Sequence, residues 1–368
     1  MDSTMEKSFY GREEAKMMAG IALVMMLVHH FFGFPDYRLE ENYFYEPLQM
    51  GGVSLERIFA GAGKLCVAIF AFTSGYAIWR NRFKYNSIKS VTQRGLRFLV
   101  NYWVIAGIFL LYALLIGDEL PSGKMFLRNL FGGATAPGYP YVNVVFAWYV
   151  CFYIILLAIS PVLLRIFSGT SKRRDVLLLA FFQLLYWGAR VSGLSGRMSS
   201  FPMDAVLGTL VVSVLGILVS KWNIFEQGGA IVKHFSKIAC FVLAGTTLMI
   251  RQIVLLMNVN VGGLPEAVFA GIFIFLCLLF IRELKSRRLK MMLTWIGVYS
   301  MNLWFLHGIF FTGSRPLQWI LYYPRVSILI LIWGLVLLMP VAVGCAWIQK
   351  RVMAAMIGLP KTIISRTE

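Results

Sequence analysis

The chain has 368 residues, of which 59% are hydrophobic and only 14% are charged, and its mean hydropathy is +0.72. This composition excludes an ordinary soluble domain and indicates a polytopic membrane protein. The formal net charge of +18 does not indicate nucleic-acid binding, because Lys and Arg form short blocks between apolar runs and alternate blocks are much richer in them. That distribution is the positive-inside pattern of membrane proteins.

Long apolar runs recur along the whole chain, and a helix needs about 20 mainly apolar residues to cross the bilayer. The predicted fold is therefore all-α: a polytopic membrane bundle of about ten transmembrane helices. They are expected at residues 15–34, 54–79, 96–117, 142–167, 175–192, 202–221, 237–257, 265–282, 291–312 and 325–348. We expect residues 1–368 to form a single integral-membrane domain, with no extra soluble domain after residue 350.

The connections alternate in charge. Basic segments are expected in the cytoplasm, and they are the amino end, 80–97, 171–174, 221–237, 282–290 and the tail after residue 349. Acidic or Gly, Pro and Asn-rich turns are expected outside, at 34–47, 117–129 and 258–267. The even number of helices places both termini in the cytoplasm.

The first apolar segment, GIALVMMLVHHFFGF at 20–34, contains two adjacent histidines, His29 and His30. An ionisable side chain within a membrane helix costs about 2.5 to 3.5 kcal/mol on insertion scales, so each one is a functional candidate. Adjacent helical residues point about 100° apart and cannot chelate one ion. With no Cys, Asp or Glu at ligand spacing nearby, no metal site is expected.

Lys64, Arg251 and His307 are further ionisable side chains within predicted helices. His30 and Arg251 each lie 14 residues beyond a lysine at the cytoplasmic start of their helix, and His307 lies at a similar distance along its own helix. At 1.5 Å per residue this is about 21 Å from the cytoplasmic edge. The count therefore predicts that His30, Arg251 and His307 lie at one level in the outer half of the bilayer. Alternatively, Arg251 and His307 reach the outer headgroups.

Buried acids are scarce, since nearly all of the 17 Asp and Glu residues fall in predicted loops or at helix ends. A proton-coupled transporter usually buries a carboxylate, and a carboxylate-based hydrolase needs a pair. Histidine, whose ordinary pKa lies near neutrality, is therefore the expected general base at depth.

Four stretches, in order, carry a resemblance to a known family. The first helix, KMMAGIALVMMLVHH, places His30 ten residues after Gly20, and the second ends in IFAFTSGYAI. QRGLRFLVNYW follows at 93–103, and the last stretch combines Trp148, thirteen residues before Pro161, with LWFLHGIFF at 303–311. Together they resemble the membrane-bound acyltransferase-3 family of bacterial integral-membrane O-acyltransferases.

The resemblance implies transfer of an acyl group from cytoplasmic acyl-CoA to a hydroxyl of a surface polysaccharide or other envelope glycan, in the bacterial cytoplasmic membrane. Acetyl-CoA is the expected donor, and succinyl or another short acyl group stays open. His30 is expected as general base or, alternatively, as an acyl-carrying nucleophile. His29 is its neighbouring candidate, or else a packing residue.

The donor is expected to contact two segments. Arg94 and Arg97 share a helical face at i and i+3, and guanidinium groups bind phosphate oxygens bidentately; the alternative is a positive-inside anchor. Arg12 is a further candidate at the amino end. The step Ser74, Gly75 and Tyr76 is expected to admit the thin pantetheine arm and orient the thioester, unless Gly75 serves close helix packing.

The acceptor is expected to contact His307, Arg251, Trp148 and Lys64, although the sequence does not identify the glycan. Two functions from other classes stay open: a non-enzymatic transporter or flippase for a glycan or lipid-linked sugar, and a glycan polymerase. The expected partners are acyl-CoA, the glycan acceptor and the lipid bilayer, without nucleic acid.

Overall fold

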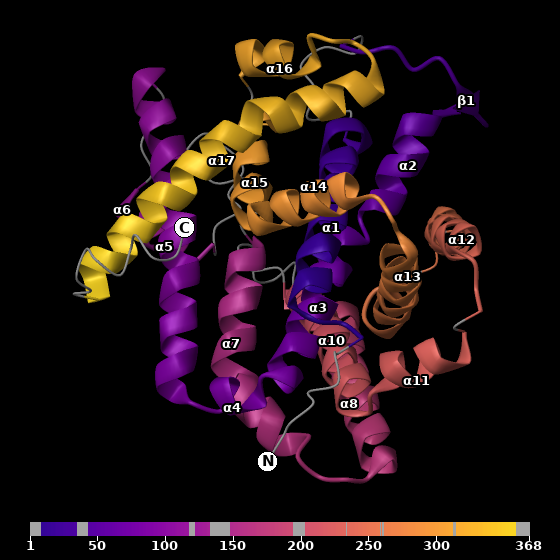
Figure 1. The fold of residues 1–368 in the computed structure, drawn as a ribbon. Coiled ribbons are helices and arrows are strands. Elements are labelled where there is room, and N and C mark those ends of the chain that lie inside the picture. Colours follow the sequence, from indigo (N-terminus) through magenta and orange to yellow (C-terminus); the bar gives the residue numbers. More distant parts are fainter. Residues whose placement is uncertain are drawn as a thin grey trace.

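The computed structural model describes residues 9–34, 43–117, 122–132, 148–193, 203–232, 234–257, 259, 261–311 and 314–357. Helices make up almost all of this part of the chain (Figure 1). The strands described are β1 (Gln49–Met50) and β2 (Val53–Ser54), which form a short antiparallel hairpin. The predicted all-α fold is confirmed.

Eight helical spans in the described residues are long and apolar enough to cross a membrane. They are α1 (Arg12–Gly33), α2 (Leu55–Gly63) joined to α3 (Cys66–Arg80), α5 (Ile88–Leu115), α7 (Trp148–Ile166), α10 (Met203–Lys221), α12 (Lys237–Leu256), α13 (Leu264–Glu283) and α17 (Ser327–Ile357). Shorter helices connect them: α4 (Arg82–Tyr85), α6 (Gly123–Asn129), α11 (Ile224–Ile231) and α16 (Arg315–Tyr322). The polytopic bundle predicted from the sequence is confirmed.

Two of the ten predicted transmembrane helices do not qualify as membrane-spanning helices in the structure. Helix α8 (Lys172–Val191) begins with four charged residues, so too little of it is apolar to qualify as a span. The segment predicted at 291–312 is broken into α14 (Arg287–Val298), α15 (Ser300–Leu306) and the 3₁₀ helix η2 (His307–Phe311). The break falls at Tyr299, whose φ of −98° and ψ of 7° leave the helical region. Figure 1 shows α14 crossing α1 and α15 turning away from it.

Helix α1 packs against α2, α3 and α14, and glycines set its closest contact. A Cβ added to Gly20 would lie 2.2 Å from the Leu293 carbonyl oxygen of α14. A Cβ added to Gly297 would lie 1.8 Å from the Lys16 carbonyl oxygen of α1. Only glycine allows two helix backbones to approach this closely. The contact fixes α1 in the bundle, and with it the position of its carboxyl-terminal histidines.

Candidate active site

Two histidines that are distant in sequence meet inside the bundle. His30 lies in the last turn of α1 and is 7% exposed, and His307 opens η2 and is fully buried. His30 Nδ1 and His307 Nε2 are 3.0 Å apart, a hydrogen-bonding distance, and the rings stack with centroids 4.7 Å apart. The structure thus joins the candidate base to a residue predicted to contact the acceptor.

The hydrogen bonds determine which ring nitrogens carry protons. His307 Nδ1 contacts the backbone carbonyl oxygen of Trp304, which can only accept a hydrogen bond, so this nitrogen carries a proton. In the neutral ring His307 Nε2 is then an acceptor, and His30 Nδ1–H donates to it. Consequently the lone pair of neutral His30 lies on Nε2, the basic nitrogen of the ring.

His29 has a different partner. It is half-buried, and its Nδ1–H donates to the Ala60 carbonyl oxygen of α2 at 2.7 Å. Its ring lies 4.9 Å from that of His30. The proton on Nδ1 is therefore used to tie α1 to α2, as the packing alternative for His29 requires.

Arg251 is buried and its charge is matched. It is 1% exposed, and its Nε and Nη2 bind the two Glu266 carboxylate oxygens at 2.8 and 2.7 Å. Its Nη1 also donates to the Gly61 carbonyl oxygen at 3.3 Å. Glu266 lies in the first turn of α13, within a segment predicted as an outer turn, so the sequence did not reveal it as a partner.

These contacts involve the groups that were predicted to share one level. His29 binds Ala60 and Arg251 binds the next residue of α2, Gly61. His30 and His307 are in direct contact. The contacts thus bring His30, His307 and Arg251 close to neighbouring residues of one another, and their common depth in the bilayer stays a prediction.

The remaining predicted acceptor residues lie near these groups. Lys64 caps the carboxyl end of α2, where the chain bends into α3, and is exposed. Trp148 is half-buried at the start of α7, beside Tyr149. The Tyr149 ring lies 5.3 Å from that of Trp304, whose carbonyl oxygen binds His307.

Trp304 adds a group that sequence reasoning missed. Its side chain is 5% exposed, and within the described residues its indole N–H has no hydrogen-bond partner. It lies three residues before His307, on the same helical face. An unpaired buried N–H is a donor that a substrate oxygen can satisfy.

Arg94 and Arg97 lie one turn apart near the start of α5. Arg94 is half-buried and stacks on Tyr85, with its guanidinium carbon 4.6 Å from the ring centroid, whereas Arg97 is exposed. Burial raises the pKa of Tyr85, so its hydroxyl is neutral at physiological pH. Arg12 is exposed at the first residue of α1.

The step Ser74, Gly75 and Tyr76 is occupied by packing contacts. Ser74 Oγ donates to the Phe70 carbonyl oxygen at 2.8 Å, and Tyr76 donates to Glu226 at 3.3 Å. A Cβ added to Gly75 would lie 1.8 Å from the Ser213 carbonyl oxygen of α10. The missing side chain of Gly75 thus accommodates a neighbouring helix, as its packing alternative requires. The contact of this step with the donor stays a prediction.

A comparison with protein families finds an acyltransferase domain over residues 17–349, nearly the whole chain. The chain belongs to the acyltransferase-3 family. It is accordingly a membrane-bound acyltransferase, of a kind that transfers acyl groups onto sugars generally. Comparisons with curated proteins and with solved structures gave no match.

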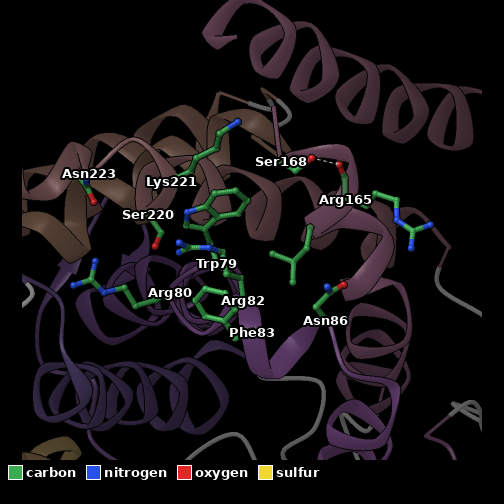
Figure 2. Close-up of a pocket in the computed structure, with 11 residues that line it drawn as sticks. Trp79, Arg80, Arg82, Phe83, Asn86, Arg165, Ser168, Ser220, Lys221 and Asn223 are labelled. Atoms are coloured by element: carbon green, nitrogen blue, oxygen red, sulfur yellow. Dashed lines mark hydrogen bonds between the residues drawn. The ribbon is translucent and has the colours of Figure 1, made fainter. Parts of the chain in front are cut away.

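This acyltransferase also has a pocket of about 790 Å³ at the end of the bundle where α3, α7 and α10 finish (Figure 2). Trp79, Arg80 and Arg82 line it from the α3–α4 junction, and Arg165 and Lys221 from α7 and α10. All three helix ends were predicted to be cytoplasmic. The sequence analysis missed this site, because each basic residue there also fits a positive-inside anchor and nothing local shows that they converge.

No three His, Cys, Asp or Glu side chains gather at metal-binding positions in the part of the acyltransferase that the structure describes.

Proposed function

We propose that the protein transfers a short acyl group, acetyl by default, from cytoplasmic acyl-CoA to a hydroxyl of a surface polysaccharide or other envelope glycan. It would act as a single domain in the bacterial cytoplasmic membrane. The observation that carries this proposal is the His30–His307 pair, a buried imidazole whose basic nitrogen is fixed by a second imidazole.

His30 acts as the general base. Its Nε2 takes the proton of the acceptor hydroxyl as the hydroxyl oxygen attacks the thioester carbonyl carbon. His307 is a positioning residue: it accepts the Nδ1–H of His30 and holds the ring in the required tautomer, as an oriented partner does in other histidine-based catalysts.

The reaction then balances without any further reagent. The new carbon–oxygen bond forms the glycan ester, the carbon–sulfur bond breaks, and the proton on His30 passes to the coenzyme A thiolate. Negative charge develops on the carbonyl oxygen during the attack, and the unpaired indole N–H of Trp304 is a buried donor suited to stabilise it.

Arg94 and Arg97 are proposed to guide the anionic donor from the cytoplasm, with Arg12, at the start of α1, as a further contact. Cations at a cytoplasmic helix end attract phosphates at a distance. Lys64 and Trp148 are proposed to contact the acceptor from the outer half.

The proposal is tested by complementing a gene deletion with His30→Ala and measuring ester signals in the NMR spectrum of the surface polysaccharide. His234→Ala is the matched control, because His234 is exposed on a connection remote in sequence from both partners. We expect the control to restore the esters and His30→Ala, at equal membrane levels, to lose them. Full ester content with His30→Ala would refute the general-base assignment.

The same experiment separates the other functions. Lost polymer export with intact ester content would indicate a transporter, and altered chain length with intact ester content would indicate a polymerase. Incubation with radiolabelled acyl-CoA but no acceptor distinguishes a base from an acyl carrier, since only a carrier gives covalent label that His30→Ala abolishes.

A further inference from the structure

We propose that the pocket around Trp79 binds the nucleotide of the coenzyme A donor. The adenine would lie against the aromatic wall that Trp79 forms, and the phosphates would bind Arg80, Arg82 and Arg165. This rests on the proposed function, because it assumes that the acyl donor is a coenzyme A thioester. It assigns the donor's nucleotide to residues other than Arg94 and Arg97.

The wall of the pocket combines an aromatic plane with cations. The Arg82 guanidinium carbon lies 5.7 Å from the Trp79 ring centroid, and Lys221 Nζ lies 5.6 Å from it. Figure 2 shows Trp79 in the middle of the lining residues, between Lys221 and Arg82. Nucleotide bases stack on aromatic rings, and guanidinium groups bind phosphate oxygens bidentately.

The positive charges of the pocket differ in how far they are neutralised. Lys221 is paired with the buried carboxylate of Asp175 and also donates to the Gly169 carbonyl oxygen at 2.6 Å. Arg80, Arg82 and Arg165 form no ion pair with a carboxylate in the described part of the chain. Lys221 therefore holds the wall in place, and the three arginines leave an excess of positive charge for an anionic ligand.

A buried hydroxyl also lines the pocket. Ser220 is 3% exposed, and among the residues described its Oγ has no hydrogen-bond partner. Buried polar atoms are normally paired, so an unpaired hydroxyl that borders a pocket is a donor for an atom bound there. A phosphate oxygen would accept a hydrogen bond from this hydroxyl.

The pocket and the histidines lie toward opposite ends of the α2–α3 segment. A Cβ at Gly63 would lie 3.4 Å from the backbone nitrogen of His29, and Trp79 lies sixteen residues further on. At 1.5 Å per residue the pocket is about 24 Å from the level of the histidines. With the nucleotide held here, only the thin pantetheine arm has to enter the bundle.

A phospholipid headgroup offers the same phosphate chemistry at the membrane surface. The aromatic wall favours the nucleotide, because a headgroup has no planar base to stack. The experiment must distinguish these two sources of phosphate.

The test uses the full-length protein in lipid nanodiscs and calorimetric titration with coenzyme A and with pantetheine. We expect Arg80→Gln/Arg82→Gln to weaken coenzyme A binding about 10-fold or more, and Trp79→Leu to weaken it as well, while pantetheine affinity stays unchanged. Arg288→Gln is the control, since Arg288 is exposed at the start of α14 and does not line the pocket.

Equal coenzyme A affinity in wild type and the double variant would overturn the proposal, as would loss of pantetheine binding in parallel. The phospholipid alternative is tested by replacing phosphatidylcholine in the nanodisc with phosphatidylglycerol. A phospholipid site is indicated if this exchange lowers the coenzyme A affinity of the wild type but not of the double variant, and the two proteins bind coenzyme A equally in phosphatidylcholine. That outcome would also overturn the proposal.

The two proposals fail separately. Coenzyme A binding that depends on the pocket, with glycan esters that do not depend on the gene, refutes the proposed function and leaves the pocket as a nucleotide site. Esters that depend on the gene, with coenzyme A binding that ignores the pocket variants, refute the nucleotide site alone.

Discussion

Two buried polar clusters lie close to α2. In one cluster His30 contacts His307, and in the other Arg251 binds Glu266. The cost of placing an ionisable group in a membrane drew attention to His30, His307 and Arg251 equally. The structure separates them by partner: the histidine pair consists of two imidazoles joined by a hydrogen bond, whereas the opposite charges of Arg251 and Glu266 balance each other.

Helix α2 is the common wall of the two clusters. Two successive carbonyl groups of α2 accept hydrogen bonds there: Ala60 accepts from His29, the neighbour of His30, and Gly61 accepts from Arg251. The difference therefore does not arise from depth. Burial in a membrane helix thus marks an ionisable group as important, and the partner of the group indicates whether it takes part in chemistry or supports the structure.

The largest expected effect is on stability, from breaking the ion pair. Arg251→Met leaves the Glu266 carboxylate without its counter-charge inside the bundle, and breaking a buried pair costs about 3 to 5 kcal/mol. We expect the lower end, because the Glu266 side chain is 15% exposed. Thermal unfolding of the detergent-solubilised protein measures the change.

The double variant Arg251→Met/Glu266→Met is the control, since it removes both charges and should recover most of the lost stability. In both variants the folded protein should still acylate the glycan. If Arg251→Met stays stable but loses transfer, Arg251 holds the acceptor and the two clusters are both functional.

The sequence predicted the members of the two clusters better than their pairing. The depth count placed His30 and His307 at one level. Their contact joins residues 277 positions apart, and helical periodicity does not indicate which distant helices meet. Glu266 was missed because a carboxylate at the first turn of a helix resembles a loop residue, although its side chain reaches Arg251. Pairing of this kind depends on how helices pack, which a single sequence does not encode locally.

The fold was predictable because apolar length alone identifies most spans. The two exceptions have local causes: charged residues occupy the first turn of α8, and the backbone leaves the helical region at Tyr299. The break between α14 and α15 matters for the site, because it allows η2 to present His307 to α1. The sidedness of the bundle stays a prediction from its charges.

A second prediction concerns the partner of His30. His307→Leu removes the acceptor for His30 Nδ1–H, and should cost part of the about 100- to 10,000-fold that a general base contributes to the rate. His307→Gln supplies an amide oxygen as a replacement acceptor and should recover part of the rate. The measurement is acyl transfer in membranes across a pH series.

A purely structural His307 would give a different result. Both variants would then lower the amount of folded protein and leave the pH profile of the remaining activity unchanged. A changed profile in His307→Leu that His307→Gln restores would establish the positioning role.

A third prediction concerns the packing of α1 against α2. A Cβ at Gly63 would lie 2.5 Å from the Met25 carbonyl oxygen of α1, so Gly63→Ala must push α1 away from α2. Overpacking of this kind costs about 1 to 3 kcal/mol. Because α1 carries the histidines, we expect transfer to fall more than in Gly245→Ala, where an added Cβ meets open space. Equal activity in the two variants would show that the histidine cluster tolerates movement of α1.

The smallest effect is expected at His29, and it separates the adjacent histidines. His29→Phe keeps an aromatic ring but leaves the Ala60 carbonyl oxygen without its donor, a loss of about 0.5 to 1.5 kcal/mol for a hydrogen bond. Transfer should stay within a few-fold of wild type, whereas His30→Phe should abolish it. Ester content at matched membrane levels provides the comparison. If His29→Phe eliminates transfer in a folded protein, the base lies on the α2 side of α1, and the hydrogen bond to Ala60 has to be exchanged for one to the acceptor during the reaction.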